Sequence, residues 1–378
     1  MASHGVPRAT VVDKSEAAKA RERKQIADYR NLEDDARRRI SSRDLSSDTF
    51  GITTALLRQN PEYYTIWNYR RVILQDILAK DLAILGEEST QEQDRLAAEK
   101  EGLTLQQREI SLIIKEDLQF LVPLLRQFPK CYWIWNHRAW LLNEATERLP
   151  TATALMFWQG ELGLVTKMLG LDSRNFHGWD YRRKCITELE RLSGQSMVLS
   201  EFEYTTKMIK SNLSNFSAWH NRSQLIPRLL RNLDADSGTR RKLFEEEFEL
   251  ITTALYTDPY DQSLWFYHQY LMSTLDEGSP TNHQQYARDT SILSNVTNED
   301  RMHYLDQELD SIKDMLDDAE DCKYIYQALL EYAASYMQIE AGNKKLSTQQ
   351  LRAWLDELMK LDPLREGRWH DLEKKLML

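Results

Sequence analysis

A short phrase that begins with tryptophan occurs five times along the chain, and this repetition is the strongest constraint on the fold. Arg or His stands three residues after each tryptophan. The five pairs are Trp67 and Arg70, Trp135 and Arg138, Trp179 and Arg182, Trp219 and Arg222, and Trp265 and His268. Successive copies are 68, 44, 40 and 46 residues apart. Periods near 40 residues are typical of helix-pair repeats or of propeller blades.

Composition decides between these two architectures. The 378 residues include only 13 Gly and 9 Pro, about half the share of an average protein. An all-β chain needs many turn residues, whereas a shortage of helix breakers with many long charged side chains favours helix nearly throughout. The repeat is therefore predicted to be a pair of helices.

Apolar residues keep a fixed register around each tryptophan. Steps of three and seven residues place side chains on one helical face. Ten residues before the tryptophan stand Leu57, Leu125, Leu169, Ile209 and Leu255; three before stand Tyr64, Tyr132, Phe176 and Phe216; seven after stand Leu74, Leu142, Ile186, Ile226 and Met272. Each unit thus consists of a helix, a turn and a second helix, and stacked units bury a continuous core.

A break lies between the two helices of each unit. The breaks are Asn60-Pro61, Phe128-Pro129, Asp172-Ser173, Asn212-Leu213 and Asp258-Pro259. Asn or Asp suits the N-cap of a helix and Pro suits its first position, so we expect these residues to start the second helix.

The ends of the repeat array are less regular. The long first spacing predicts an insertion, and residues 86–102 have the polar composition for it. A degenerate sixth unit surrounds Trp369, which follows Asp362-Pro363. Residues 276–285 and 294–300 read as loops, with further helices after them. Residues 1–45 are expected to form an N-terminal arm and a charged helix, and residues 46–378 a single α-helical repeat domain.

Several function classes are disfavoured. Net charge is −10, which argues against a general nucleic-acid binder. Three dispersed cysteines form no zinc or disulfide pattern, and no metal-spaced His/Cys cluster, P-loop or nucleophile motif is present. The chain lacks a signal peptide and a run of about 18 apolar residues, so a cytoplasmic location is expected. Each repeated tryptophan reads as a packing anchor, and each arginine as a partner for a carboxylate of the next helix or for backbone.

The repeats resemble those of the protein prenyltransferase α subunits. The resemblance covers roughly residues 50–275 and is carried by NPEYYTIWNYRRVIL, FPKCYWIWNHRAWLL, DSRNFHGWDYRRKCI and NLSNFSAWHNRSQLI. DSRNFHGWDYRR and LDPLREGRW are most similar to the short form of the type II, or Rab geranylgeranyltransferase, α subunit. The resemblance implies an all-α fold, a right-handed superhelical array of helical hairpins forming a crescent.

The resemblance also implies a reaction and partners. The family's α subunit wraps a β subunit in an obligate heterodimer, which transfers geranylgeranyl from geranylgeranyl diphosphate to C-terminal cysteines of Rab GTPases presented by an escort protein. The β subunit holds zinc and this chain holds no metal; a magnesium ion with the diphosphate is left open. Zinc keeps the acceptor thiol as a thiolate.

Five residues of this chain correspond to the family's active-site edge. Lys130, directly after Pro129, is expected to stabilise the diphosphate, and Tyr132, Asn175, Phe176 and His177 to line the mouth of the site. The alternative for Lys130 is an ordinary surface lysine at a helix start, and for the third-repeat residues N-capping and packing. His4 could in principle reach a metal on the β subunit, or belong to a disordered terminus.

Two other functions stay open at this stage. One is the α subunit shared by farnesyltransferase and type I geranylgeranyltransferase, which acts on CaaX proteins. That subunit places Gln, which receives the peptide carboxylate, where this chain has Trp133; Trp is bulky and offers only an indole N–H, so Trp133 argues against it. The other is a non-enzymatic scaffold of tetratricopeptide type, which the repeat period and the Trp-x-x-Arg spacing disfavour.

Overall fold

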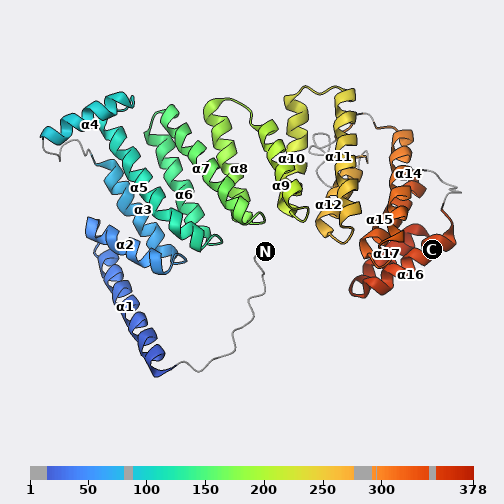
Figure 1. Cartoon of the computed structure of the whole chain (residues 1–378), viewed down its shortest axis with the longest axis horizontal. Coiled ribbons are helices and arrows are strands. Elements are labelled where there is room, and N and C mark those ends of the chain that lie inside the picture. Colours follow the sequence, from blue (N-terminus) through green and yellow to red (C-terminus); the bar gives the residue numbers. More distant parts are fainter. Residues whose placement is uncertain (1–14, 81–87, 276–291, 295, 340–345) are drawn as a thin grey trace. The chain divides into compact units, whose positions relative to one another are not determined.

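The computed structural model describes residues 15–80, 88–275, 292–294, 296–339 and 346–378, and all regular structure in these ranges is helical. The prediction of an all-α array of helical hairpins is confirmed (Figure 1). The chain folds as two compact units, which meet in the sequence between Gln195 and Ser196. The single repeat domain expected over residues 46–378 stays a prediction.

Unit 1 contains an N-terminal helix and three hairpins, α2 with α3, α5 with α6 and α7 with α8. Its helices are α1 (Glu16–Ser41), α2 (Ser47–Gln59), α3 (Tyr64–Ala79), α4 (Glu88–Lys100), α5 (Leu105–Gln127), α6 (Tyr132–Arg148), α7 (Thr151–Leu171) and α8 (Phe176–Ser193). The segment predicted as an insertion lies between the first and second hairpins and contains α4, which packs on α5.

Unit 2 contains four hairpins in its described residues. Its helices are α9 (Val198–Ser211), α10 (Phe216–Asn232), α11 (Ser237–Thr257), α12 (Gln262–Ser273), α14 (Asn298–Asp314), η2 (Met315–Asp317), α15 (Lys323–Ile339), α16 (Thr348–Leu361), η3 (Pro363–Arg365) and α17 (Glu366–Leu376). Residues 294–300 were expected to be loop, but α14 begins at Asn298 because Thr297 and Asp300 form a capping box. The other expected loop, 276–285, lies outside the described residues.

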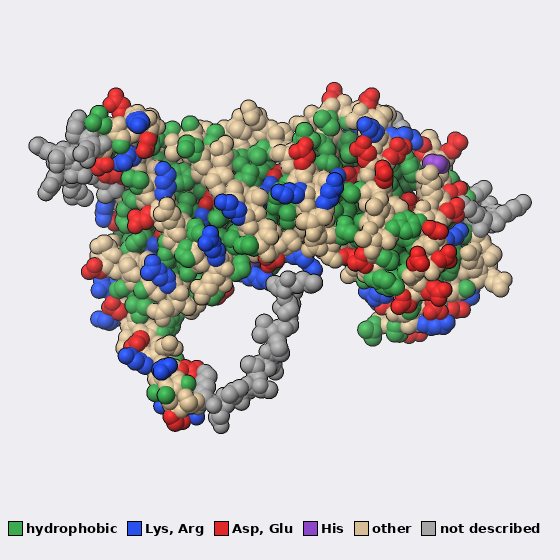
Figure 2. All heavy atoms as spheres, in the orientation of Figure 1, with side chains coloured by type: hydrophobic (Ala, Val, Ile, Leu, Met, Phe, Trp, Pro, Cys, Tyr) green, Lys and Arg blue, Asp and Glu red, His purple; other side chains and the backbone are tan. Residues whose placement is uncertain are grey.

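N-terminal helix α1 packs on α2, and only Ala36 of its residues is fully buried. Tyr29 on α1 accepts a hydrogen bond from Asn60, and Glu33 accepts one from Tyr63. Both basic and acidic side chains lie along this helix (Figure 2). Its exposed face is therefore polar and faces water.

The breaks inside the hairpins end the first helix and do not cap the second, contrary to expectation. Asn60, Asp172, Asn212 and Asp258 are C-cap residues, and each side-chain oxygen accepts a bond from the backbone N–H two residues later. These Asx turns reverse the chain before the next helix begins. The N-caps of the second helices in the same four hairpins are Tyr63, Asn175, Asn215 and Asp261.

The repeated tryptophans are packing anchors, as predicted. All five are buried, and each indole N–H donates to the carbonyl six residues earlier. The bonds are Trp67 to Pro61 at 2.7 Å, Trp135 to Pro129 at 2.9 Å, Trp179 to Ser173 at 2.9 Å, Trp219 to Leu213 at 2.8 Å and Trp265 to Pro259 at 2.7 Å. The tryptophan therefore fastens the turn to the second helix while its ring fills the core.

The repeated arginines join one hairpin to the next. Arg70 pairs with Asp117, Arg138 with Glu161 and Arg222 with Glu247, and both members of every pair are buried. Each carboxylate stands 18 residues before the tryptophan of its own hairpin. The remaining N–H groups of Arg222 reach Thr205 and Thr206 at 3.1 and 2.8 Å in its own hairpin. Arg182 donates to Thr166 in the same way, at 2.7 Å.

A third side chain donates a further hydrogen bond to each of these buried carboxylates. The residue two positions after the carboxylate hairpin's own tryptophan donates to the acid: Tyr181 to Glu161 at 2.7 Å, Tyr267 to Glu247 at 2.5 Å, and His137 to Asp117 at 2.7 Å. A buried carboxylate therefore receives bonds from two consecutive hairpins. We call the arginine, the carboxylate and this third group the relay. A buried charge is stable only when its hydrogen bonds are satisfied, so the relay specifies how the hairpins stack.

Helices α14 and α15 form a repeat that the tryptophan pattern does not reveal. Tyr326 takes the tryptophan position, and its hydroxyl donates to the Glu320 carbonyl six residues earlier at 2.8 Å. Glu308 stands 18 residues before Tyr326 and bonds His268 of the previous hairpin at 2.7 Å. His268 thus replaces arginine in the relay, and its other ring nitrogen lies 2.7 Å from the Tyr332 hydroxyl.

The degenerate unit around Trp369 is consequently the seventh hairpin. Trp369 is buried and donates to the Asp362 carbonyl at 3.0 Å, one residue further back than in the other hairpins. The added residue accompanies the short helix η3, which begins at Pro363 with Asp362 as its N-cap. Asp362 is also the C-cap of α16, and the second helix α17 has Arg365 as its N-cap, so the predicted capping of the second helix does not occur here either.

We predict that His137 makes stability depend on pH between about 6.5 and 4. Its Nδ1 accepts from Arg71 at 3.2 Å, so the bond to Asp117 uses the proton on Nε2. Burial lowers the pKa of His137 to about 4, whereas an unfolded histidine titrates near about 6.5. Within this window the unfolded chain binds a proton that the folded chain does not, so stability falls as pH falls.

Urea unfolding of the wild type and of His137→Gln at pH 7 and pH 5 tests this. The stability gap between the two proteins should narrow at pH 5, because the variant lacks the titrating ring. An equal gap at both pH values would contradict the assignment. Asp117 does not disturb the comparison, because its pKa of about 2 lies below the window.

Candidate functional site

Large aromatic side chains begin the second helices and are left exposed. Tyr64, Tyr132 and Phe176 are 54%, 51% and 66% exposed, although the tryptophan three residues later is buried in every case. Phe216 of unit 2 is exposed in the same position. The sequence register placed these aromatics on the apolar face with the core residues. The structure corrects this, because the first residue of each second helix projects past the packed part of the hairpin.

In unit 1 these aromatics form a continuous edge. Trp133 lies 5.5 Å from Tyr64 and 5.3 Å from Tyr132 between ring centroids. His177 lies 6.1 Å from Tyr132 and 3.9 Å from Phe176. We call Tyr64, Tyr132, Trp133, Phe176 and His177 the aromatic edge. Three hairpins contribute to it, so the structure brings together three of the predicted site residues (Tyr132, Phe176 and His177) with two others.

Lys130 stands in the turn between α5 and α6, next to this edge. Its side chain is exposed and forms no ion pair with another residue that the structure describes. The turn itself is fixed, because the Pro129 carbonyl accepts from the Trp135 indole and from the Asn175 amide, each at 2.9 Å. An exposed ammonium group on a turn that is held in place can bind an anion without a rearrangement of the backbone.

Asn175 supports that turn from the third hairpin. The residue is buried, 4% exposed, and its Oδ1 accepts from the backbone N–H groups of His177 and Gly178 at 3.0 and 3.2 Å. Its amide nitrogen donates to Pro129 at 2.9 Å. Asn175 was expected at the mouth of the site, and the structure places its side chain between hairpins instead. It caps α8 and ties the third hairpin to the Lys130 turn.

His177 makes a second tie to the same turn. Its ring hydrogen-bonds the backbone of Lys130, and burial lowers the pKa of His177 despite the raising effects of Asp180 and Glu62. The imidazole is therefore held neutral more readily than a free histidine. Pro129 and Lys130 are thus both held by side chains of the third hairpin. Sequence spacing alone did not signal this arrangement.

Two members of the edge, Tyr64 and Trp133, were not among the predicted site residues. Tyr64 shares its register position with Tyr132 and Phe176, so the register itself was the signal. Arg71 was also missed: it donates to Asn136 at 2.5 Å, and Asn136 donates to the Tyr132 hydroxyl at 3.2 Å. Of the other tryptophan hairpins, only the third has arginine at this position, as Arg183, so no motif shared by all the hairpins marks Arg71.

Nothing in the described part of the chain resembles a metal centre. No group of three or more His, Cys, Asp and Glu side chains there could hold a metal ion. All three cysteines are buried, and burial raises the pKa of each thiol, that of Cys131 to about 11. Cys131 and Cys322 donate to the Pro61 and Pro259 carbonyls of the preceding hairpins. His4 lies outside the described residues.

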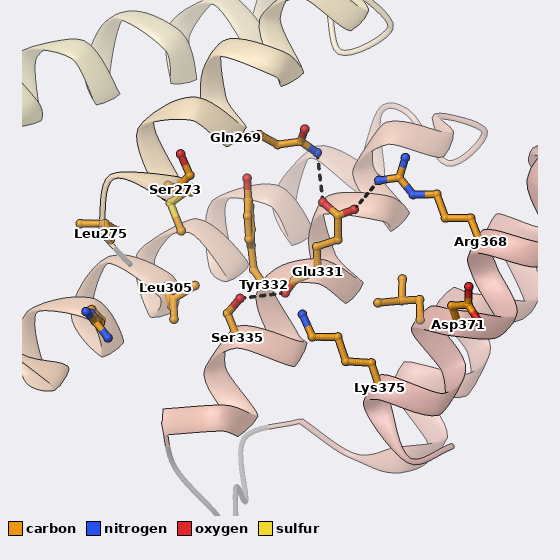
Figure 3. Close-up of a pocket in the computed structure, with 13 residues that line it drawn as sticks. Gln269, Ser273, Leu275, Leu305, Glu331, Tyr332, Ser335, Arg368, Asp371 and Lys375 are labelled. Carbon is orange, nitrogen blue, oxygen red and sulfur yellow. Dashed lines mark hydrogen bonds and ion pairs between the residues drawn. The ribbon is translucent and has the colours of Figure 1, made fainter. Parts of the chain in front are cut away.

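A pocket of about 480 Å³ lies in unit 2 among α12, α14, α15 and α17. Charged side chains line it, and two of them, Glu331 and Arg368, form an ion pair (Figure 3). Glu331 accepts from Gln269 at 3.1 Å and from Arg368 at 2.9 Å. The contacts of Glu331 therefore join α12, α15 and α17 and give this side of the pocket a structural role.

Hairpins fastened by Trp and joined by Arg define a class of proteins. The model of the protein prenyltransferase alpha subunit repeat matches residues 47–77, 114–145, 158–189, 198–229 and 244–275. These ranges are the first five hairpins. The structure of Candida albicans protein geranylgeranyltransferase-I complexed with GGPP has the same fold, with a TM-score of 0.60 and 18% identity over 93% of this chain and 91% of that one.

Closer relatives identify the branch of that class. Geranylgeranyl transferase type-2 subunit alpha of Candida albicans is 32% identical over 97% of this chain and 96% of its own length. The protein of the same name from Schizosaccharomyces pombe is 32% identical over 99% and 98%. The human one is 32% identical over 77% of this chain and 45% of its own length. The chain belongs to the family of geranylgeranyl transferase type-2 α subunits.

A membrane-spanning helix needs both length and apolar character. Among the described residues, none of the helices combines the length and the apolar character needed to cross a bilayer.

Proposed function

We propose that this chain assembles with a prenyltransferase β subunit, and that the heterodimer transfers geranylgeranyl from geranylgeranyl diphosphate to C-terminal cysteines of Rab GTPases presented by an escort protein. The identity of about 32% to the fungal type-2 α subunits, extended over nearly the whole chain, carries this proposal. The alternative is a CaaX-specific enzyme. Trp133 in the aromatic edge disfavours it, because Trp is bulkier than the Gln of that enzyme type and offers only one indole N–H. We further propose that the complex works in the cytoplasm.

The reaction forms a thioether and releases diphosphate. The acceptor sulfur attacks C1 of the isoprenoid, the bond from C1 to the diphosphate oxygen breaks, and the electron pair leaves with the diphosphate. Zinc held by the β subunit, when bound, keeps the acceptor as a thiolate. A magnesium ion beside the diphosphate stays an open element of the proposal.

Lys130 is the residue of this chain that we assign to the leaving group. Negative charge grows on the diphosphate in the transition state, and a cation already in place stabilises it without reorganisation. Lys130 suits this role because its turn is held by Asn175, His177 and Trp135 while its side chain is exposed. Lys130 lies in the turn just before Cys131, the N-cap of α6, and not inside the helix.

The aromatic edge would supply an apolar wall. The exposed rings of Tyr132 and Phe176 and the half-buried ring of His177 form a contiguous surface beside Lys130. An isoprenoid chain packed against these rings would be removed from water, and its reactive end would lie near the Lys130 ammonium. Asn175 acts in this proposal as a positioning residue, since its side chain is used inside the hairpin stack.

A transfer assay tests the proposed function. The chain is co-expressed with candidate β subunits, and labelled geranylgeranyl and farnesyl diphosphates are offered with a Rab–escort complex or with a CaaX peptide. Geranylgeranyl transfer to Rab only with the escort protein is expected. Transfer to the CaaX peptide alone would replace the proposal with the alternative, and failure to bind any β subunit would reject both.

For Lys130 we predict a loss of rate without a loss of assembly. In single turnovers Lys130→Ala should slow transfer roughly a hundred- to a thousandfold, the range for removing one group that stabilises charge in the transition state. Lys130→Arg should recover part of the rate. Arg174→Ala is the matched control, because Arg174 is the exposed cation at the same place in the third hairpin turn. Equal rates for wild type and Lys130→Ala would reduce Lys130 to a surface residue.

A further inference from the structure

A second pocket, of about 370 Å³, opens between α5 and α7, the first helices of the second and third hairpins. The buried ion pair of Arg138 and Glu161 lies at its base. The remaining wall is mainly apolar and includes Leu118, Val122, Met156, Phe157, Gly160 and Leu164. None of these residues belongs to the aromatic edge or to the Lys130 turn.

The first hairpin junction fills the equivalent space with two aromatic rings. There the Arg70 guanidinium lies between two rings, with its carbon 3.8 Å from the centroid of Phe50 and 4.7 Å from that of Phe120. The equivalent positions around Arg138 are occupied by Leu118 and Leu164. Both leucines line the pocket. The pocket therefore lies where the first junction has two aromatic rings and the second junction has two leucines.

The fourth hairpin supports the comparison independently. Arg222 carries Phe202 over its guanidinium at 3.7 Å, and Phe202 has the same place in its helix as Phe50 and Leu118. The backbone agrees as well, because Nη1 of Arg138 donates to the Leu118 carbonyl at 2.8 Å and Nη1 of Arg222 to the Phe202 carbonyl at 3.3 Å. Leu118 therefore lacks the aromatic ring of Phe50 and Phe202, but its backbone carbonyl makes the same hydrogen bond.

We propose that the groove between α5 and α7 binds an aromatic side chain of a partner protein, which stacks on the Arg138–Glu161 pair as Phe50 stacks on Arg70. Arginine is well suited to this contact because its flat, weakly hydrated guanidinium stacks on rings. The recess over Gly160 is open: a Cβ placed there meets no heavy atom within 4 Å.

The surroundings of the pocket favour a protein as the source of that ring. Met156 at its rim is 70% exposed, and Leu112, one turn before Lys115 on α5, is 46% exposed. Clustered exposed apolar side chains are typical of interaction surfaces. Lys115 lines the pocket and lies 5.8 Å over the Phe157 ring. Its positive charge favours an acidic residue beside the inserted aromatic one.

The test uses the assembled α–β heterodimer and a capped dipeptide of 4-fluorophenylalanine and glutamate, observed by fluorine NMR. We expect saturable line broadening in the millimolar range. The capped Leu-Glu dipeptide should displace this probe about fivefold less effectively than capped Phe-Glu, since it lacks the cation–π contact.

Two glycine variants locate the binding. Gly160→Leu fills the groove and should abolish broadening. Gly163→Leu should leave it unchanged, because Gly163 has the same open surroundings on α7 but does not line the pocket. Both variants exchange a helical Gly for a better helix former, so neither is expected to unfold the chain. Leu118→Phe supplies the missing ring from within and should also abolish broadening.

Three outcomes would overturn the proposal. The first is no saturable broadening with the wild-type heterodimer, and the second is equal displacement by the Phe and Leu dipeptides. The third is a Gly160→Leu variant that binds like wild type or like Gly163→Leu. Binding of p-cresol as tight as that of the fluorinated dipeptide would assign the pocket to small aromatic compounds and overturn the protein partner.

Discussion

The buried pair between an arginine of one hairpin and a carboxylate of the next is the interaction on which the rest of the structure depends. Removing two charges from water is costly, and the cost is offset only when geometry and additional hydrogen bonds are complete. In the Arg138–Glu161 and Arg222–Glu247 pairs a tyrosine hydroxyl completes the carboxylate. Apolar packing alone would tolerate sliding of one hairpin on another. The relay accepts one register, because any other leaves a buried charge unpaired.

Function follows from that fixed register. The turns of consecutive hairpins come to lie side by side, so Asn175 can hold the Pro129 carbonyl and His177 the backbone of Lys130. The side chains that hold the candidate catalytic lysine thus belong to the neighbouring repeat. The same register places Tyr132 next to His177 and creates the aromatic edge. Residues around the relay can differ between hairpins, as do the leucines beside Arg138 that leave a pocket.

Much of this fold could be predicted from the sequence, because tryptophan, arginine and the apolar positions repeat at fixed spacing. The carboxylate partner could not: it stands 18 residues before the tryptophan, on another helix, and alternates between Asp117 and glutamate. The hairpin of α14 and α15 escaped because Tyr326 replaces tryptophan and His268 replaces arginine. At the candidate site, the register put the aromatics on the packed face, although the first residue of each second helix is exposed. Whether Asn175 faces substrate or the interior depends on packing between hairpins.

A double-mutant cycle on Arg138→Met and Glu161→Leu tests the central claim most directly. Both residues are buried, and the bonds between them join the second hairpin to the third. Each single substitution should destabilise the chain by roughly 3 kcal/mol or more, because it leaves the opposite charge buried and unpaired. The double variant should lose much less than the sum, with a coupling energy of about 2 kcal/mol or more. Additivity within about 0.5 kcal/mol would contradict the claim that this pair fixes the stacking of the hairpins.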